Sequence, residues 1–122
     1  MKYLFVEPNK IPIVKETVNV SMSLNEIFGR DRYTVLHTMA VHSDKQNVSV
    51  IGYPLDIKGH DDNRLLYGSP NYRSIGGVIQ GNFVLVGIDG DRYVSLNEHQ
   101  ISILKRLYGR RSIEETKECL RP

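Results

Sequence analysis

The amino-acid sequence predicts an α+β fold, in which an antiparallel twisted sheet of about five to seven strands carries one short and one longer helix packed on one face. Short runs rich in Val, Ile and Tyr recur along the chain and are separated by turn residues, which is typical of strands. Helix signals come only after the second of these runs and near the end of the chain. Runs of strands followed by helices are typical of an antiparallel α+β domain.

The first half of the chain predicts four strands. Residues 2–7 form the first, closed by a turn at Pro8-Asn9, and residues 11–20 form the second, with apolar and polar side chains in alternation. Residues 33–42 and 47–53 form two more and are predicted to pair as a hairpin. An open antiparallel sheet of this kind leaves edge strands that must be covered, and the sequence therefore predicts a homo-oligomer, with a two-fold dimer as the simplest solution.

Two helices are indicated by the same tetrapeptide, Ser-Leu-Asn-Glu, at residues 23–26 and 95–98. It has the form of a capping box, in which the Ser hydroxyl accepts an amide hydrogen and the Glu side chain reaches back. Gly29 suits a C-terminal cap and makes the first helix short, while Gly109 follows the second. The second helix presents a broad apolar stripe, made of Leu96, Ile103, Leu104, Leu107 and Tyr108.

The second half of the chain carries the plainest strand signals. Residues 54–73 are polar and rich in turn residues, and are predicted to form a loop. Strands resume at Ile75, and the apolar run 83–88 reads as a strand covered on both faces. An Asp-Gly turn at 88–91 then returns the chain as a hairpin partner over residues 92–94.

Length and composition predict one domain. The chain has 122 residues, 40% of them hydrophobic and 25% charged, which is ordinary for a globular protein. Residues 1–109 are assigned to a single α+β domain and residues 110–122 to a short C-terminal helix or tail. The single cysteine, Cys119, excludes an internal disulfide. The first apolar segment ends at Val6, too early for a signal peptide or an anchor, so we expect a soluble intracellular protein without a membrane partner.

The strongest candidate binding site lies in the predicted loop. Arg supplies planar donors for phosphate or carboxylate groups, and Tyr supplies a stacking face. Eleven consecutive positions contain six such polar and aromatic residues: Asn63, Arg64, Tyr67, Asn71, Tyr72 and Arg73. They could hold a nucleotide or anchor a protein interface, and the alternative is that they only satisfy one another within the loop.

Other clusters point to alternative chemistry. The run His60-Asp61-Asp62 could hold a hard divalent ion for a small metal-dependent hydrolase, although consecutive ligands converge poorly and a solvated turn is the competing reading. Lys105, Arg106, Arg110 and Arg111 gather near the chain end, either as a solvated helix terminus or as a phosphate-binding patch for a nucleic acid. The formal charge of +2 is too small to favour the nucleic acid. We find no nucleophile motif and assign no catalytic residue, metal or cofactor.

Five segments resemble a known family when taken in order. They are the opening strand 3–10, the segment 23–29, the Asn63-Arg64 step, the strand 78–87 and the helix entry 94–96. Together they resemble the family numbered three-eight-four-six in the series of domains of unknown function. That family occurs chiefly in bacteriophages, plasmids and the Firmicutes that carry them. The resemblance implies a mobile-element setting and a host cytoplasmic location.

These observations lead to one functional expectation. A compact domain without catalytic residues, with a Tyr-, Arg- and Asn-rich segment and a mobile-element resemblance, suggests a non-enzymatic protein that counters a host defence. Its partner would be a host defence protein or a small nucleotide signal that it sequesters. The alternatives are the metal-dependent hydrolase and the nucleic-acid-binding module described above.

Overall fold

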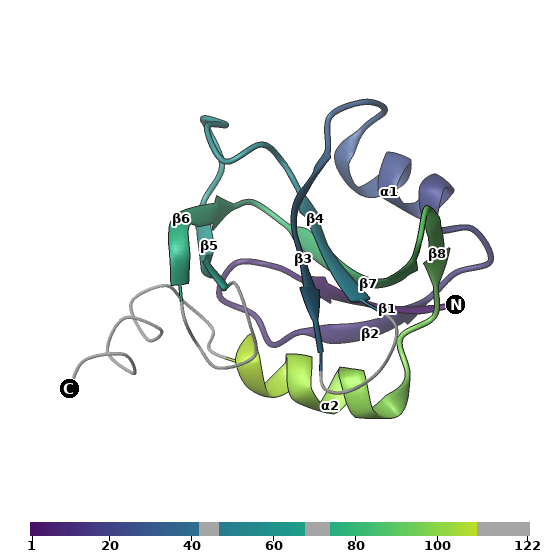
Figure 1. The fold of residues 1–122 in the computed structure, drawn as a ribbon. Helices are drawn as coiled ribbons and strands as arrows, with labels where there is room; N and C mark the ends of the chain where they lie inside the picture. Colours follow the sequence, from purple (N-terminus) through teal and green to yellow (C-terminus); the bar gives the residue numbers. More distant parts are fainter. Residues whose placement is uncertain (42–46, 68–73, 110–122) are drawn as a thin grey trace.

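The computed structural model describes residues 1–41, 47–67 and 74–109 (Figure 1). The predicted C-terminal helix or tail, 110–122, lies outside the described residues. In chain order the elements are β1 (Lys2–Val6), β2 (Ile13–Glu16), α1 (Val20–Phe28), β3 (Thr34–Ala40), β4 (Asn47–Gly52), β5 (Asp62–Tyr67), β6 (Ser74–Gln80), β7 (Phe83–Asp89), β8 (Arg92–Val94) and α2 (Glu98–Leu107).

The main sheet is antiparallel throughout, as predicted. Its strand order is β2-β1-β7-β4-β3, and β8 pairs with the far end of β7. The two predicted hairpins are confirmed, because β3 pairs with β4 and β7 pairs with β8 across the turn at Gly90, whose φ is 64°. The apolar run from Phe83 forms the central strand, and its first five residues are buried. A strand in that position is covered on both faces, which explains why its sequence shows no polar alternation.

The two helices pack on opposite faces of this sheet, so the prediction that both lie on one face is wrong (Figure 1). Alternate residues of a strand point to opposite faces. In β7, Phe83 and Leu85 join the core cluster with α2, whereas Val84 and Val86 join the cluster with α1. The apolar stripe of a helix shows that it packs on a sheet, but the choice of face depends on where the connecting segments lead.

The N-terminal cap of helix α1 lies four residues before the predicted cap, at Asn19 and not at Ser23. The side chain of Asn19 caps the helix by accepting a hydrogen bond from the main-chain N of Met22 at 3.1 Å. The hydroxyl of Ser23, the predicted cap, instead donates to Thr17 Oγ1 at 2.7 Å. The early start places Val20 one turn ahead of Leu24 on the buried face, and the predicted strand 11–20 shortens to β2 for the same reason. Gly29 ends the helix as predicted, with a φ of 94°.

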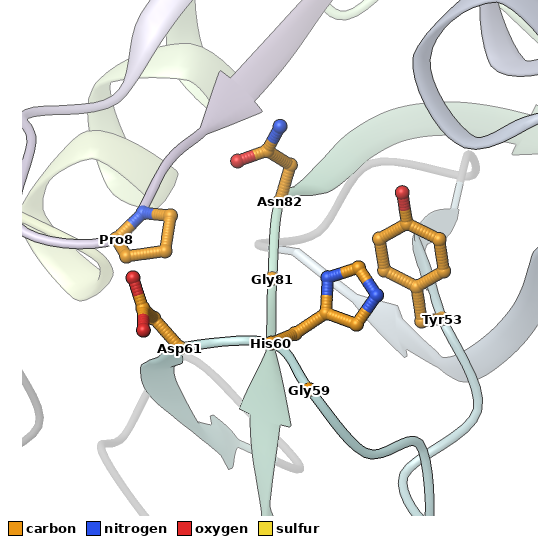
Figure 2. A pocket seen from close by; sticks show the side chains of 7 residues that line it. All are labelled: Pro8, Tyr53, Gly59, His60, Asp61, Gly81 and Asn82. Atoms are coloured by element: carbon orange, nitrogen blue, oxygen red, sulfur yellow. The ribbon is translucent and has the colours of Figure 1, made fainter.

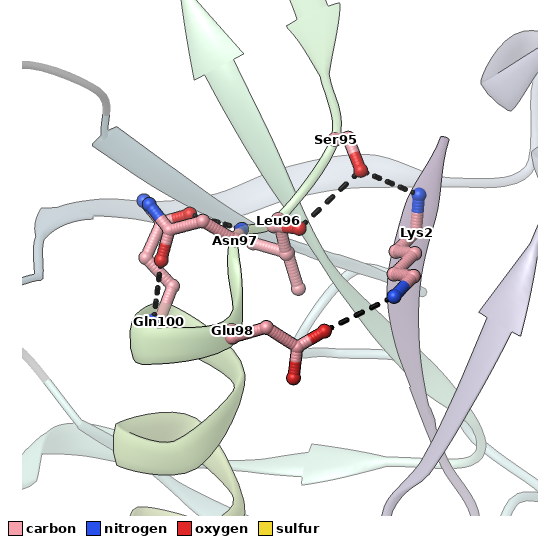
Figure 3. A network of polar contacts seen from close by, with 6 residues as sticks. All are labelled: Lys2, Ser95, Leu96, Asn97, Glu98 and Gln100. Atoms are coloured by element: carbon pink, nitrogen blue, oxygen red, sulfur yellow. Dashed lines mark hydrogen bonds and ion pairs between the residues drawn. The ribbon is translucent and has the colours of Figure 1, made fainter.

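Helix α2 also begins at a different cap from the predicted one. The two residues that would open the predicted helix, Ser95 and Leu96, form hydrogen bonds with Lys2 of strand β1 instead. Lys2 O accepts from Leu96 N at 3.0 Å, and Lys2 N donates to Ser95 Oγ at 2.8 Å. Asn97 then caps the helix and forms a reciprocal pair with Gln100 (Figure 3). The chemistry of the predicted box is kept but shifted by two residues. Neither α1 nor α2, nor any other helix in the described ranges, is long and apolar enough to cross a membrane.

A second, two-stranded sheet corrects the prediction that residues 54–73 form a loop. Strand β5 occupies residues 62–67 and pairs antiparallel with β6. Its Leu66 and Tyr67 side chains are buried in the same cluster as α2. Two register shifts interrupt the β5–β6 ladder, and they disturb the alternation that would mark a strand in the sequence.

Candidate functional site

A polar hollow of about 370 Å³ lies where several connections meet at one end of the main sheet. It is bordered by the turn after β1, by the end of the β4–β5 connection and by the tight turn between β6 and β7 (Figure 2). This volume is near the lower end of the range of about 300–1,000 Å³ that is usual for ligand pockets. Its lining residues are Pro8, Tyr53, Gly59, His60, Asp61, Gly81 and Asn82.

Two neighbouring rings form one wall of the hollow. The His60 imidazole lies beside the Tyr53 ring, with a centroid separation of 4.4 Å and a tilt of 32° between the planes (Figure 2). Tyr53 is in turn held edge-on by Phe28 from helix α1, at 5.0 Å and 90°. The half-buried Tyr53 therefore has a fixed position, while His60 is exposed at the mouth of the hollow. Such a pair offers a flat, partly apolar surface.

Polar groups form the other side of the hollow. The exposed Asp61 carboxylate projects beside Pro8, and the half-buried Asn82 amide lies above Gly81 (Figure 2). The main chain here is held by a hydrogen bond from Gly81 N to Asp61 O, at 2.7 Å. Among the described residues, the lining contains a carboxylate, an amide and an imidazole but no Lys or Arg side chain. These groups suit hydrogen bonding to a neutral polar ligand better than direct binding of a phosphate.

Gly81 allows the rings to approach the turn. Its φ is 73°, and an added Cβ would lie 3.0 Å from both His60 Nδ1 and Tyr53 Cδ2. We expect Gly81→Ala to lower the free energy of unfolding by more than the roughly 1–2 kcal/mol of a left-handed Ala, since the rings must also move. Gly90→Ala is the matched control, with a φ of 64° and no atom within 4 Å of the added Cβ. Urea unfolding of both variants measures the difference, and equal losses would mean that the rings are not closely packed on Gly81.

Three of the six residues predicted to form a ligand-binding loop lie on a strand instead. Asn63, Arg64 and Tyr67 lie on β5, and their side chains are buried rather than exposed on a loop. Asn63 Nδ2 donates to Val6 O at 3.0 Å and to Gly81 O at 2.8 Å, so this amide joins β1 to the turn below the hollow. The other three predicted positions, Asn71, Tyr72 and Arg73, lie outside the described residues.

The buried guanidinium of Arg64 links three segments of the chain. It donates to Tyr108 O at 3.3 Å, to Lys10 O at 2.7 Å and to the Asn63 side-chain oxygen at 2.8 Å. These contacts join strand β5 to the end of α2 and to the connection between β1 and β2. These contacts give Arg64 a structural role, and its predicted contact with a ligand stays a prediction.

The structure brings the residues of the two alternative clusters, the His60-Asp61-Asp62 run and the basic residues near the chain end, only partly together. His60 and Asp61 line the hollow, whereas Asp62 starts β5 and accepts a hydrogen bond from Gln80 Nε2 at 3.2 Å. Within the described ranges, no three His, Cys, Asp or Glu side chains are close enough together to hold a metal ion. Lys105 and Arg106 are exposed in the last turn of α2, and Arg110 and Arg111 lie outside the described residues.

Sequence reasoning missed most of the hollow. Gly81 and Asn82 are distant from His60 in the sequence, and neither they nor Tyr53 belong to a recognisable motif. The only local signal is the short polar turn between two apolar strands, which contains Gly81. Comparisons with protein-family models, curated proteins and solved structures found no match to this chain.

Proposed function

We propose that this protein is a non-enzymatic binding protein of phage or mobile-element origin that counters a host defence in the host cytoplasm. It binds a component of the defence or sequesters a small nucleotide signal. The mobile-element setting comes from the resemblance of residues 3–10, 23–29 and 78–87 described above.

The hollow beside Tyr53 and His60 is the observation that carries the ligand-binding part of this proposal. Nucleobases are commonly held between or upon aromatic side chains and hydrogen-bonded along their edges. The neighbouring Tyr53 and His60 rings supply an aromatic surface, and the Asp61 carboxylate and Asn82 amide supply hydrogen-bonding groups. Because Phe28 holds the Tyr53 ring edge-on, little ordering of that ring is needed when a ligand binds.

The proposal includes a homodimer formed through a sheet edge. Strands β2 and β3 end the sheet order, and Ile13, Val14 and Val35 on them are exposed apolar residues. Open edges with apolar side chains favour pairing with another chain. Sedimentation should give a species of twice the 14.0 kDa chain mass at micromolar concentration, and a single-chain mass throughout would contradict this part.

Capture from host cells tests the function. The full chain is expressed in the host, purified under mild conditions and denatured, and the released small molecules and co-purified proteins are identified by mass spectrometry. A nucleotide or a defence protein should be recovered with the wild-type chain and lost with His60→Ala. Arg92→Ala, an exposed variant on β8 outside the lining of the hollow, should retain it. Recovery of neither class would contradict the proposal.

A further inference from the structure

We propose that strand β3 is the edge through which two copies of this chain pair, antiparallel to each other and around a two-fold axis at Thr38. This inference rests on the homodimer included in the proposed function. It deepens that proposal because it names the edge, the direction of pairing and the residue at the axis.

The two edges of the main sheet differ in how well they are protected against pairing. In the part of the chain that the structure describes, β2 pairs with β1 only and β3 with β4 only. Protected edge strands are typically short or carry charged residues, Lys above all. Strand β2 has both features, since it is four residues long and contains Lys15 and Glu16. Strand β3 has neither, because it is seven residues long and its sequence, TVLHTMA, contains no Asp, Glu, Lys or Arg.

The β3–β4 ladder indicates which part of β3 is suited to a further strand. A register shift between Val35 and His37 interrupts the ladder, and a bulge of this kind discourages pairing beside it. From His37 to Ala40 the register is regular. Of these four residues Met39 alone is buried, so most of the side chains there are open to contact with a second copy. The regular stretch is therefore the segment that pairs.

Thr38 is the residue of this stretch that suits a two-fold axis. Residues that oppose each other in an antiparallel pair lie on the same face of the sheet, so an axis perpendicular to the sheet places one residue opposite its own copy. With Thr38 at the axis, two hydroxyls meet, and such Thr pairs are favourable across strands. The Thr38 hydroxyl already shares a hydrogen bond with Ser49 Oγ at 3.2 Å, and its remaining capacity is available to the second copy. No like charges are opposed when His37 is neutral.

Pairing of this kind separates the two hollows. Gly52, which precedes Tyr53 of the hollow, pairs with Thr34 at the start of β3. The hollow therefore lies toward the Thr34 end of β3, and antiparallel pairing places the hollow of the second copy toward the opposite end. Each copy keeps a complete hollow, so separation of the dimer should leave ligand binding intact.

Cross-linking of the full chain tests the edge. Cys119→Ser removes the single native thiol, and Thr38→Cys or Val14→Cys then places one thiol on β3 or on β2. A short bismaleimide should join two Thr38→Cys chains into a covalent dimer and leave the Val14→Cys chains single. Cross-linking of the Val14→Cys chains in place of the Thr38→Cys chains would overturn the inference.

An added charge provides an independent test. Thr38→Lys places two ammonium groups opposite each other at the axis, and the dissociation constant of the dimer, measured by sedimentation, should rise at least roughly tenfold. Thr38→Val removes the hydroxyl without adding charge, and Val14→Lys adds the same charge to the other edge, so both should stay near the wild-type value. Circular dichroism identifies the variants that are folded, and the cross-linking decides the question if Thr38→Lys is not.

The outcomes separate this inference from the proposed function. A wild-type dimer whose dissociation constant is unchanged in folded Thr38→Lys would overturn β3 as the edge and leave the homodimer standing. A wild-type chain that stays single at every concentration would overturn both the inference and the homodimer. The ligand-binding part of the proposed function is decided separately, by the capture experiment.

Discussion

Replacing Arg64 with Ala should lower the free energy of unfolding by about 3–5 kcal/mol, because several buried acceptors lose a charged donor at once and each unpaired group costs about 1–3 kcal/mol. The side chain is 0% exposed and donates to main-chain oxygens of Lys10 and Tyr108. A domain of this size has a total stability of only about 5–15 kcal/mol, so the variant should be near the limit of folding. Urea unfolding followed by circular dichroism measures the change.

Arg92→Ala provides the matched control for this prediction. Arg92 is exposed on β8, and its truncation should change the stability by no more than about 0.5 kcal/mol. Arg64→Lys keeps the positive charge but lacks the planar set of donors, and should fall between the two. If Arg64→Ala unfolds at the same urea concentration as the wild type, the guanidinium would have to lie at the surface, as the sequence had suggested.

Replacing Phe83 with Ala should cost a similar amount, about 3–5 kcal/mol, through loss of apolar contact and the cavity that remains. Phe83 is fully buried at the start of the central strand, in the cluster that includes α2, and its ring meets Tyr108 edge-on at 5.3 Å. Backbone pairing of Phe83 with Val6 and Gly52 prevents the strand from moving inward to fill the space. Chemical denaturation again gives the loss of stability.

An exposed apolar residue serves as the comparison. Val35 on edge strand β3 is 50% exposed, so Val35→Ala should remove little buried area and cost well below 1 kcal/mol. Phe83→Leu should lose less than Phe83→Ala because it leaves a smaller cavity. A loss below about 1 kcal/mol for Phe83→Ala would mean that the core between β7 and α2 is loosely packed.

Tyr108, which packs against Phe83 in the core, is itself fully buried. Desolvation is the main cause that raises the pKa of its hydroxyl well above the usual value of a phenol. The ionised form is therefore excluded from the folded state at ordinary pH, and the ring behaves as part of the apolar core.

Strand positions were largely predictable because the signal is local and repeated. The apolar run at Phe83 and the Asp-Gly turn after it predicted both the central strand and its hairpin. Helix starts were less predictable, since Asn19 and Asn97 compete with the nearby serines as caps. Hydrogen bonds from Lys2, at the opposite end of the chain, decide where α2 begins.

The sequence by itself determined the α+β class, the antiparallel hairpins and the presence of two amphipathic helices, because periodicity and turn chemistry are written in neighbouring residues. Only the tertiary structure decided which face each helix covers and that Arg64 is an interior residue. It also decided that Tyr53, His60 and Asn82 surround one hollow. These features depend on contacts between residues far apart in the chain, and the burial of a side chain is set by what covers it and not by its own polarity.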